Sequence, residues 1–218
     1  MNYICLFSKP PIPGQTKSRL ATTIGTKAAS ELACAMLQDI CTVALNVKNT
    51  VPQLWHPPGT APQDFDGMVP HAFTFQAQQG DNLGQRMSAA FAHTLEQKQN
   101  NRVIIIGADC ITHTPNSLCA ALSDLNYYRV VIQPADDGGY VLVGQSIWSP
   151  ALFNDIKWGG KDVYENSIKN MQSAGISYKK LSITFDVDTI DDLVKITNFI
   201  ETNERPHTRT WMKSYGWI

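Results

Sequence analysis

An unbroken apolar run near the middle of the chain constrains the fold more than any other segment. Residues 102–109 read Arg-Val-Ile-Ile-Ile-Gly-Ala-Asp, so that four large apolar side chains are followed by glycine and a carboxylate. β-Branched residues favour strands, and a strand without polar alternation is covered on both of its faces. The run therefore predicts a central strand of an α/β domain, with Asp109 just beyond its end.

Strands and helices alternate along the rest of the chain. Apolar periodicity predicts further strands at 3–7, 53–56, 72–76, 130–134, 140–144 and 178–185. It predicts helices at 17–47, 82–97, 114–125, 161–174 and 191–201. This order favours a mostly parallel sheet with helices on both faces.

The length of 218 residues favours one domain, spanning residues 1–218, over two small ones. Apolar residues make up 43% of the chain and charged residues 17%, a composition typical of a folded protein. The tail at about 205–218 carries Trp211, Tyr215 and Trp217. Because that is more aromatic than a solvated tail, we expect it to pack on the domain or on a partner subunit.

Several classes of partner are not expected. The formal net charge is -1 and the basic residues form no long stripe, so the charge pattern does not predict a nucleic-acid ligand. The apolar stretch at 3–7 is too short for a signal peptide, and no segment approaches the roughly 20 apolar residues of a membrane span. Five scattered cysteines without CxxC spacing suit a reducing compartment, so we expect a cytoplasmic protein.

A basic, proline-rich loop follows the first predicted strand. Pro13 and Gly14 lie in it, with Lys9, Lys17 and Arg19 around them. A glycine turn lets backbone N–H groups approach an anion, and a helix N-terminus with nearby cations suits a polyphosphate. A rigid turn with solvated cations explains the same residues equally well, and the GxxxxGK[ST] pattern of a Walker A loop is absent from the sequence.

Three aspartates are candidate metal ligands. Asp109 ends the strongest strand, and Asp186 and Asp188, two residues apart, would share a face in extended geometry. Mg²⁺ prefers such oxygen ligands together with substrate phosphates. The alternative is structural: Asp109 would cap the turn at 112–114, and Asp188 or Thr189 would cap the last helix.

Two further segments have a functional and a structural interpretation. Asp137, Gly138 and Gly139 form a sharp turn that could present N–H groups and a carboxylate to an acceptor, or could be merely a turn. Arg86 follows a Gly- and Asn-containing helix start and would lie near an anion, or would be an exposed residue of a capped helix.

Five segments in this order carry a resemblance to a known family. They read KPPIPGQTKSRL, QGDNLGQRM, IIIGADC, PADDGGYVLVG and FDVDT, and they span Lys9 to Thr189. The chain resembles the DUF2064, or rSAM-associated transferase, family of the GT-A-like nucleotide-diphospho-sugar transferases. It is also similar to the phospholactate guanylyltransferases of the F420 pathway and, more distantly, to molybdenum-cofactor guanylyltransferases. It departs from the family pattern at Ile111, commonly Pro, and at Gly159, commonly Ser or Thr.

The resemblance implies a three-layer α/β/α, Rossmann-like GT-A domain that binds an activated nucleotide with Mg²⁺, or alternatively Mn²⁺. The nucleotide-binding candidates are Lys9, Pro13, Gly14, Lys17, Arg19 and Arg86. Asp109, Asp186 and Asp188 would hold the metal, and Asp137, Gly138 and Gly139 would line the acceptor side. The catalytic candidates are Lys17, Arg19 and Asp109.

The resulting expectation is a magnesium-dependent transferase. Nucleotidyl transfer from a nucleoside triphosphate to a small-molecule acceptor, with release of pyrophosphate, is favoured because the basic loop matches a highly charged leaving group. Glycosyl transfer from a nucleotide-diphosphate sugar is the first alternative, and a non-catalytic nucleotide-binding partner protein is the second. A homodimer remains an open alternative to a monomer.

Overall fold

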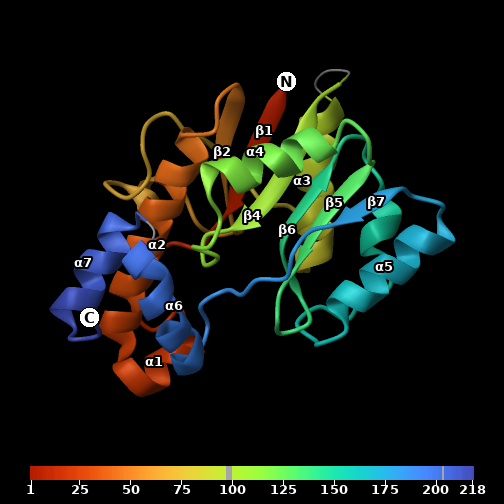
Figure 1. Ribbon diagram of the computed structural model, residues 1–218. Coiled ribbons are helices and arrows are strands. Elements are labelled where there is room, and N and C mark those ends of the chain that lie inside the picture. The colour runs from red at the N-terminus through yellow and green to blue at the C-terminus, as the bar shows by residue number, and fades with distance from the viewer. Residues whose placement is uncertain (97–99, 203) are drawn as a thin grey trace.

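The computed structural model describes residues 1–96, 100–202 and 204–218. These residues form a seven-stranded sheet in the order β3-β2-β1-β4-β6-β5-β7 (Figure 1). The strands are β1 (Asn2–Phe7), β2 (Thr50–His56), β3 (Thr74–Ala77), β4 (Arg102–Gly107), β5 (Val130–Pro134), β6 (Tyr140–Gln145) and β7 (Tyr178–Lys180). β6 runs antiparallel to β4 and β5, and the other paired strands are parallel. The prediction of a mostly parallel sheet is confirmed.

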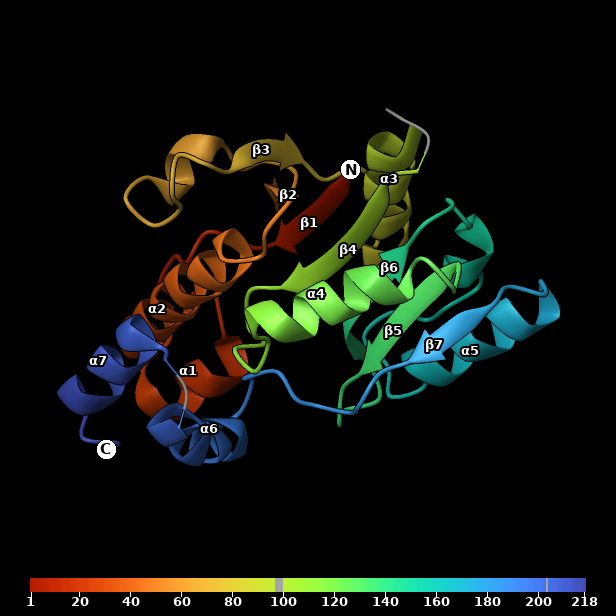
Figure 2. The same cartoon turned by 45° about the horizontal axis from the view of Figure 1, so that its top comes forward.

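Helices cover both faces of this sheet. The helices of the described residues are α1 (Ser18–Ile24), α2 (Thr26–Leu45), α3 (Leu83–Glu96), α4 (Pro115–Asp124), α5 (Val163–Ser173), α6 (Ile190–Thr202) and α7 (Pro206–Ser214), with short 3₁₀ turns η1 (Pro62–Phe65) and η2 (Pro150–Phe153). α2 and α4 pack on one face, whereas α3 and α5 pack on the other (Figures 1 and 2). The architecture is the expected three-layer α/β/α fold.

β4 shows why the apolar run predicted the centre of the sheet. Ile104 and Ile106 point into the core beneath α2 and α4, while Val103 and Ile105 point into the core beneath α3 and α5. Because side chains alternate between the faces of a strand, both sets must be apolar. β4 pairs with β1 on one side and β6 on the other, so the prediction of a central strand is confirmed.

The prediction of one continuous helix at 17–47 is wrong, because the structure has two helices there. Gly25 adopts φ 86°, which separates α1 from α2, and its N–H caps α1 by donating to the Ala21 carbonyl. An L side chain rarely adopts this conformation, whereas glycine does so readily. The sequence marked no break there because the apolar periodicity continues across the glycine.

The predicted strand at 178–185 is too long. β7 ends at Lys180, and Thr184 forms an isolated bridge with Ala135. The neighbouring strand β5 ends at Pro134, where its register also shifts, and proline has no N–H to extend a ladder. The expected helix at 82–97 corresponds to α3, and its last residue, 97, lies outside the described residues.

α2 corrects the expectation that no segment has the length and apolar character of a membrane span. Thr26–Leu45 has 20 residues and passes that test by length and composition, as the single such helix among the described residues. Within the tested window, however, 72% of the residues are buried inside the protein. The helix is apolar because it lies between the sheet and a second helical layer.

That second layer contains α1, α6 and α7, which pack with α2 at one end of the sheet (Figure 2). The aromatic tail forms α7 and packs on α2, where the Trp211 Nε1–H donates to the Ala28 carbonyl at 3.1 Å. Ile111 and Val187, from the segments that carry the candidate metal ligands, are fully buried in the same cluster. The helical layer therefore supports the loops at this end of the sheet.

Candidate functional site

Three segments distant in sequence meet at one end of the sheet. The loops after β1 and β4 lie side by side because these strands are parallel neighbours, and open α/β sheets bind ligands at such carboxyl ends. The Ala108 N–H donates to the Phe7 carbonyl at 3.3 Å, and the Val187 N–H donates to the Asp109 carbonyl at 3.2 Å. These bonds place Asp109 between the first loop and the segment that leads into α6.

The structure brings the three candidate metal ligands together. One carboxylate oxygen from each of Asp109, Asp186 and Asp188 lies within 4.8 Å of the others. Val187, between the last two, is fully buried and faces the helical layer. The alternation predicted from extended geometry thus brings Asp186 and Asp188 to the same group of carboxylates, here called the carboxylate cluster.

The helix caps that competed for these aspartates come from other residues. The Thr114 hydroxyl caps α4 by accepting from the Ser117 N–H at 3.1 Å. At the start of α6, the Thr189 hydroxyl accepts from the Asp192 N–H at 3.4 Å, so that Thr189, one of the two expected caps, caps the helix. The Asp192 carboxylate in turn accepts from the Thr189 N–H at 2.9 Å and from the Asp188 N–H at 3.2 Å. The carboxylates of Asp109 and Asp188 are therefore available for other contacts.

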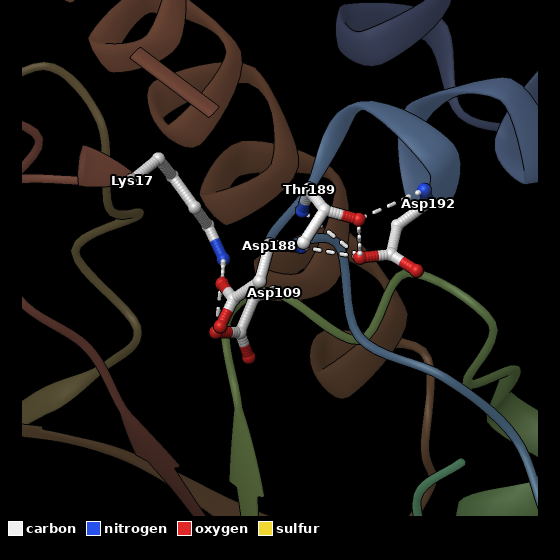
Figure 3. Close-up of polar contacts among 5 residues, drawn as sticks. All are labelled: Lys17, Asp109, Asp188, Thr189 and Asp192. Atoms are coloured by element: carbon white, nitrogen blue, oxygen red, sulfur yellow. Dashed lines mark hydrogen bonds and ion pairs between the residues drawn. The ribbon is translucent and has the colours of Figure 1, made fainter. Parts of the chain in front are cut away.

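Lys17 makes those contacts. Its Nζ lies 2.7 Å from Asp188 Oδ1 and 3.0 Å from Asp109 Oδ2, and its side chain is 8% exposed (Figure 3). Burial alone would lower the pKa of Lys17, but the two carboxylates outweigh it and raise the pKa. Burial would raise the pKa of Asp109, but Lys17 holds it below its usual range. The residue predicted to contact phosphate thus bridges two predicted metal ligands.

The cluster still holds more negative charge than Lys17 neutralises. Burial, followed by the carboxylates of Asp109, Asp188 and Asp137, raises the pKa of Asp186 to about 7. A divalent cation would relieve this repulsion, and carboxylate oxygens are the ligands that Mg²⁺ and Mn²⁺ prefer. The residues present therefore fit the metal that the sequence led us to expect.

A cleft of about 840 Å³ opens above the carboxylate cluster. Lys9, Arg19, Arg86 and Lys161 all line it. The Arg86 Nε–H donates to the Gly80 carbonyl at 2.9 Å, which keeps the side chain at the rim. Among the residues that the structure describes, none of these four cations forms an ion pair with a carboxylate, so no acidic side chain neutralises their charges.

The two interpretations of the proline-rich loop apply to different parts of it. Pro13 and Gly14 are exposed and do not line the cleft. The turn is held by its own groups, including the Thr16 hydroxyl, which donates to the Pro10 carbonyl at 3.0 Å. The interpretation as a rigid turn therefore holds for the tip, whereas Lys9 and Lys17 reach the cleft from its two ends.

The far wall of the cleft contains residues that the sequence did not single out. The Trp158 ring lies so close to Gly84 that a Cβ there would overlap it, and it meets Tyr140 edge to face at 6.3 Å. Lys161 follows in the same segment. Trp158 and Gly84 are 74 residues apart and share no motif, so no local signal in the sequence marks the pair.

The turn on the predicted acceptor side is tied to the start of α5. The Asp137 Oδ1 accepts from the Gly139 N–H at 2.8 Å, and the Gly138 carbonyl accepts from the Tyr164 N–H at 2.9 Å. Asp137 and Gly139 line the cleft, and their contact with an acceptor stays a prediction. Gly138 does not line it and instead allows the turn to form, with φ 91° and its α-carbon facing the Lys161 carbonyl.

Replacing Gly138 by Ala is therefore expected to destabilise the protein. The positive φ costs about 1 kcal/mol, and the overlap of the new Cβ with the Lys161 backbone adds about 2 kcal/mol. Urea denaturation measures the change, with Gly59→Ala as a matched control because Gly59 has φ 81° and open space around it. An equal decrease in the free energy of unfolding in the two variants would show that the close approach to Lys161 does not affect stability.

Comparison with known proteins agrees with this geometry. A family model described as "Uncharacterized protein conserved in bacteria (DUF2064)" matches residues 40–160. A crystal structure from Desulfovibrio desulfuricans G20, named a "putative nucleotide-diphospho-sugar transferase", is 31% identical, with TM-score 0.89, over 98% of this chain and 94% of that chain. No curated protein sequence matches the chain.

More distant structures share the fold. Rv0371c from Mycobacterium tuberculosis H37Rv, solved as a complex with manganese, is 16% identical with TM-score 0.54 over 90% of this chain and 97% of that chain. The 4-diphosphocytidyl-2C-methyl-D-erythritol synthase of Anaerococcus prevotii DSM 20548 is 8% identical with TM-score 0.59 over 92% and 96%. The fold is thus that of nucleotidyltransferases and nucleotide-diphospho-sugar transferases. Since the family model covers more than half of the residues, the chain belongs to the DUF2064 family.

Proposed function

We propose that this protein is a magnesium-dependent transferase that uses an activated nucleotide, and that it transfers the nucleotidyl group to a small acceptor with release of pyrophosphate. The observation that supports this most is the carboxylate cluster at the base of a cleft lined by four cations without carboxylate partners. An acidic base and a basic rim suit a metal-bound polyphosphate, because the metal needs carboxylates and the phosphates need cations.

The acidic and the basic residues of the cleft have different proposed roles. Asp109, Asp186 and Asp188 would hold Mg²⁺, which neutralises charge on the donor's phosphates when bound. Lys9, in the loop after β1, and Arg19, in the first turn of α1, bind and orient those phosphates. Reactions of this class need positioning and charge stabilisation more than covalent help from the protein, and a cleft with fixed charges supplies both.

The acceptor enters from the opposite wall. Asp137 and the Gly139 backbone lie there beside Trp158, and Lys161 adds a positive charge. The wall therefore offers an aromatic surface, a carboxylate and an ammonium group within one cleft. These groups suit a small polar acceptor that carries negative charge.

Nucleotidyl transfer is favoured over glycosyl transfer by the number of cations. A departing pyrophosphate carries more negative charge than a nucleoside diphosphate. Four cations that have no carboxylate partner among the described residues match the larger charge. The distant relative named a diphosphocytidyl-methylerythritol synthase supports the same chemistry. Glycosyl transfer from a nucleotide-diphosphate sugar remains the second candidate, because the name of the Desulfovibrio relative favours it.

The proposal of a divalent cation such as Mg²⁺ or Mn²⁺ is supported by a second observation. Mn²⁺ accepts the same carboxylate ligands as Mg²⁺, and the manganese complex of Rv0371c shows that a protein of this fold binds such an ion. Because Mg²⁺ and Mn²⁺ share these ligands, Mn²⁺ is a suitable probe of the proposed Mg²⁺ site.

A thermal-shift screen tests the proposal. Nucleoside triphosphates and nucleotide sugars are each added with and without Mg²⁺, since a ligand of the native state raises apparent stability by about 2.7 kcal/mol at 100 times its dissociation constant. We expect a metal-dependent rise in Tm with one triphosphate, followed by pyrophosphate release once an acceptor is supplied. A rise with nucleotide sugars alone would replace nucleotidyl by glycosyl transfer, and binding without any turnover would indicate a non-catalytic nucleotide-binding protein.

A further inference from the structure

The C-terminal tail reaches the loop that carries Asp109. Arg205, directly before α7, is 5% exposed, and its Nε–H donates to the Ile111 carbonyl at 2.9 Å. The same guanidinium donates through Nη2 to the His113 carbonyl. The two acceptors lie two and four residues beyond Asp109, so one side chain from the tail holds both carbonyls of this loop.

The geometry of a guanidinium explains why arginine suits this place. The carbonyls of Ile111 and His113 belong to a loop without a strand partner, and buried carbonyls require donors. A planar guanidinium offers several N–H groups at fixed angles and satisfies two carbonyls at once. An ammonium group has the charge but lacks this fixed fork.

Arg205 is itself held firmly. The Asp39 carboxylate of α2 accepts from the His207 N–H at 3.1 Å, the Thr208 N–H at 2.8 Å and the Thr208 hydroxyl at 2.6 Å. Trp211 adds its bond to α2 one turn later. The start of α7 is thus attached to a core helix, and Arg205 projects from a fixed base.

The 109–113 loop is also held by contacts other than those of Arg205, and these contacts involve different groups. The Asp109 carbonyl accepts from the Val187 N–H, which couples the loop to the Asp186–Asp188 segment. Ile111, two residues later, is fully buried among residues of the helical layer. Arg205 fixes the backbone on the far side of Ile111, so the loop is held on both sides of the turn that aims the Asp109 carboxylate.

We propose that Arg205 is a positioning residue for the carboxylate cluster, because it holds the 109–113 loop in the shape that places Asp109 beside Asp186 and Asp188. This inference rests on the proposed metal site. It assigns to the aromatic tail, which lies outside the residues 40–160 matched by the family model, a task in the function of the carboxylate cluster.

Three variants separate positioning from general stability. Arg205→Met removes the donors, and Arg205→Lys keeps the charge without the fork. Trp211→Phe removes the bond between α7 and the Ala28 carbonyl but leaves Arg205 and its donors in place. Two quantities are measured below the melting temperature of each variant: Mn²⁺ affinity by electron paramagnetic resonance, and hydrogen–deuterium exchange of residues 108–113. Groups that orient metal ligands typically change affinity by about 10- to 100-fold when removed.

We expect Arg205→Met to raise the Mn²⁺ dissociation constant by about tenfold or more and to accelerate exchange in the loop, with Arg205→Lys intermediate. Trp211→Phe is expected to lower Tm but to keep wild-type Mn²⁺ affinity. Wild-type affinity and exchange in Arg205→Met, or equal weakening in Trp211→Phe, would overturn the inference. If the wild-type protein bound no Mn²⁺, the proposed metal site would fail, and the exchange of residues 108–113 would still decide whether Arg205 holds the loop.

Discussion

Replacing Asp109 by Asn is expected to reduce metal-dependent turnover of the nucleotide donor by about 100-fold or more, the usual loss when a group that stabilises transition-state charge is removed. The amide keeps the shape of the side chain but removes the negative charge that would hold the cation. Steady-state pyrophosphate release at saturating Mg²⁺ measures the effect.

A matched control separates this effect from a general loss of charge or stability. Asp66 is exposed, lies in the segment between η1 and β3 and is not part of the cleft, so Asp66→Asn is expected to retain wild-type turnover. Urea denaturation of Asp109→Asn should show a modest change, because the Asp109 side chain is 37% exposed and its ion pair is partly screened. Turnover of Asp109→Asn within a few-fold of wild type would exclude Asp109 as a metal ligand.

Replacing Lys17 by Gln is expected to act in opposite directions on metal affinity and on turnover. The Lys17 ammonium lies between Asp109 and Asp188, where a cation held by these residues must bind. Metal binding therefore requires Lys17 to leave, and the competing ion pair reduces apparent affinity. Without it, Mn²⁺ affinity of the nucleotide-free protein should rise by about tenfold, whereas turnover should fall because a cation near the donor's phosphates is lost.

Lys17→Arg is the control for charge. It keeps a cation between the carboxylates, so its Mn²⁺ affinity should stay close to that of the wild type. Calorimetric titration of Mn²⁺ into the three proteins measures the affinities. Weaker binding in Lys17→Gln than in the wild type would show that Lys17 supports the metal site in its free state and does not compete with the ion.

Much of the fold follows from local patterns. The run at 103–106 predicted β4 because both faces of a central strand are apolar, and Asp109 followed as the residue beyond the carboxyl end. The spacing of Asp186 and Asp188 predicted a shared face, and the structure places both beside Asp109. Both predictions rest on the alternation of side chains in extended backbone, which extends over a few residues and needs no knowledge of distant contacts, although Asp186 and Asp188 lie beyond the end of β7.

The remaining features depend on contacts between distant positions. Lys17 pairs with carboxylates 92 and 171 residues away, and Arg205 binds carbonyls of a loop more than 90 residues before it. The break at Gly25 depends on a positive φ, which glycine adopts readily. The pattern of apolar residues gives no information about φ. Only the folded chain brings such residues together, so local periodicity and spacing carry no signal for them.

We expect the carboxylate cluster to bind a divalent cation in place of Lys17. Anomalous diffraction from crystals grown with Mn²⁺ tests this expectation. An anomalous peak should lie among oxygens of Asp109, Asp186 and Asp188, with the Lys17 ammonium displaced from both of its present partners. A cluster without such a peak at saturating Mn²⁺, with Lys17 still bridging Asp109 and Asp188, would contradict it.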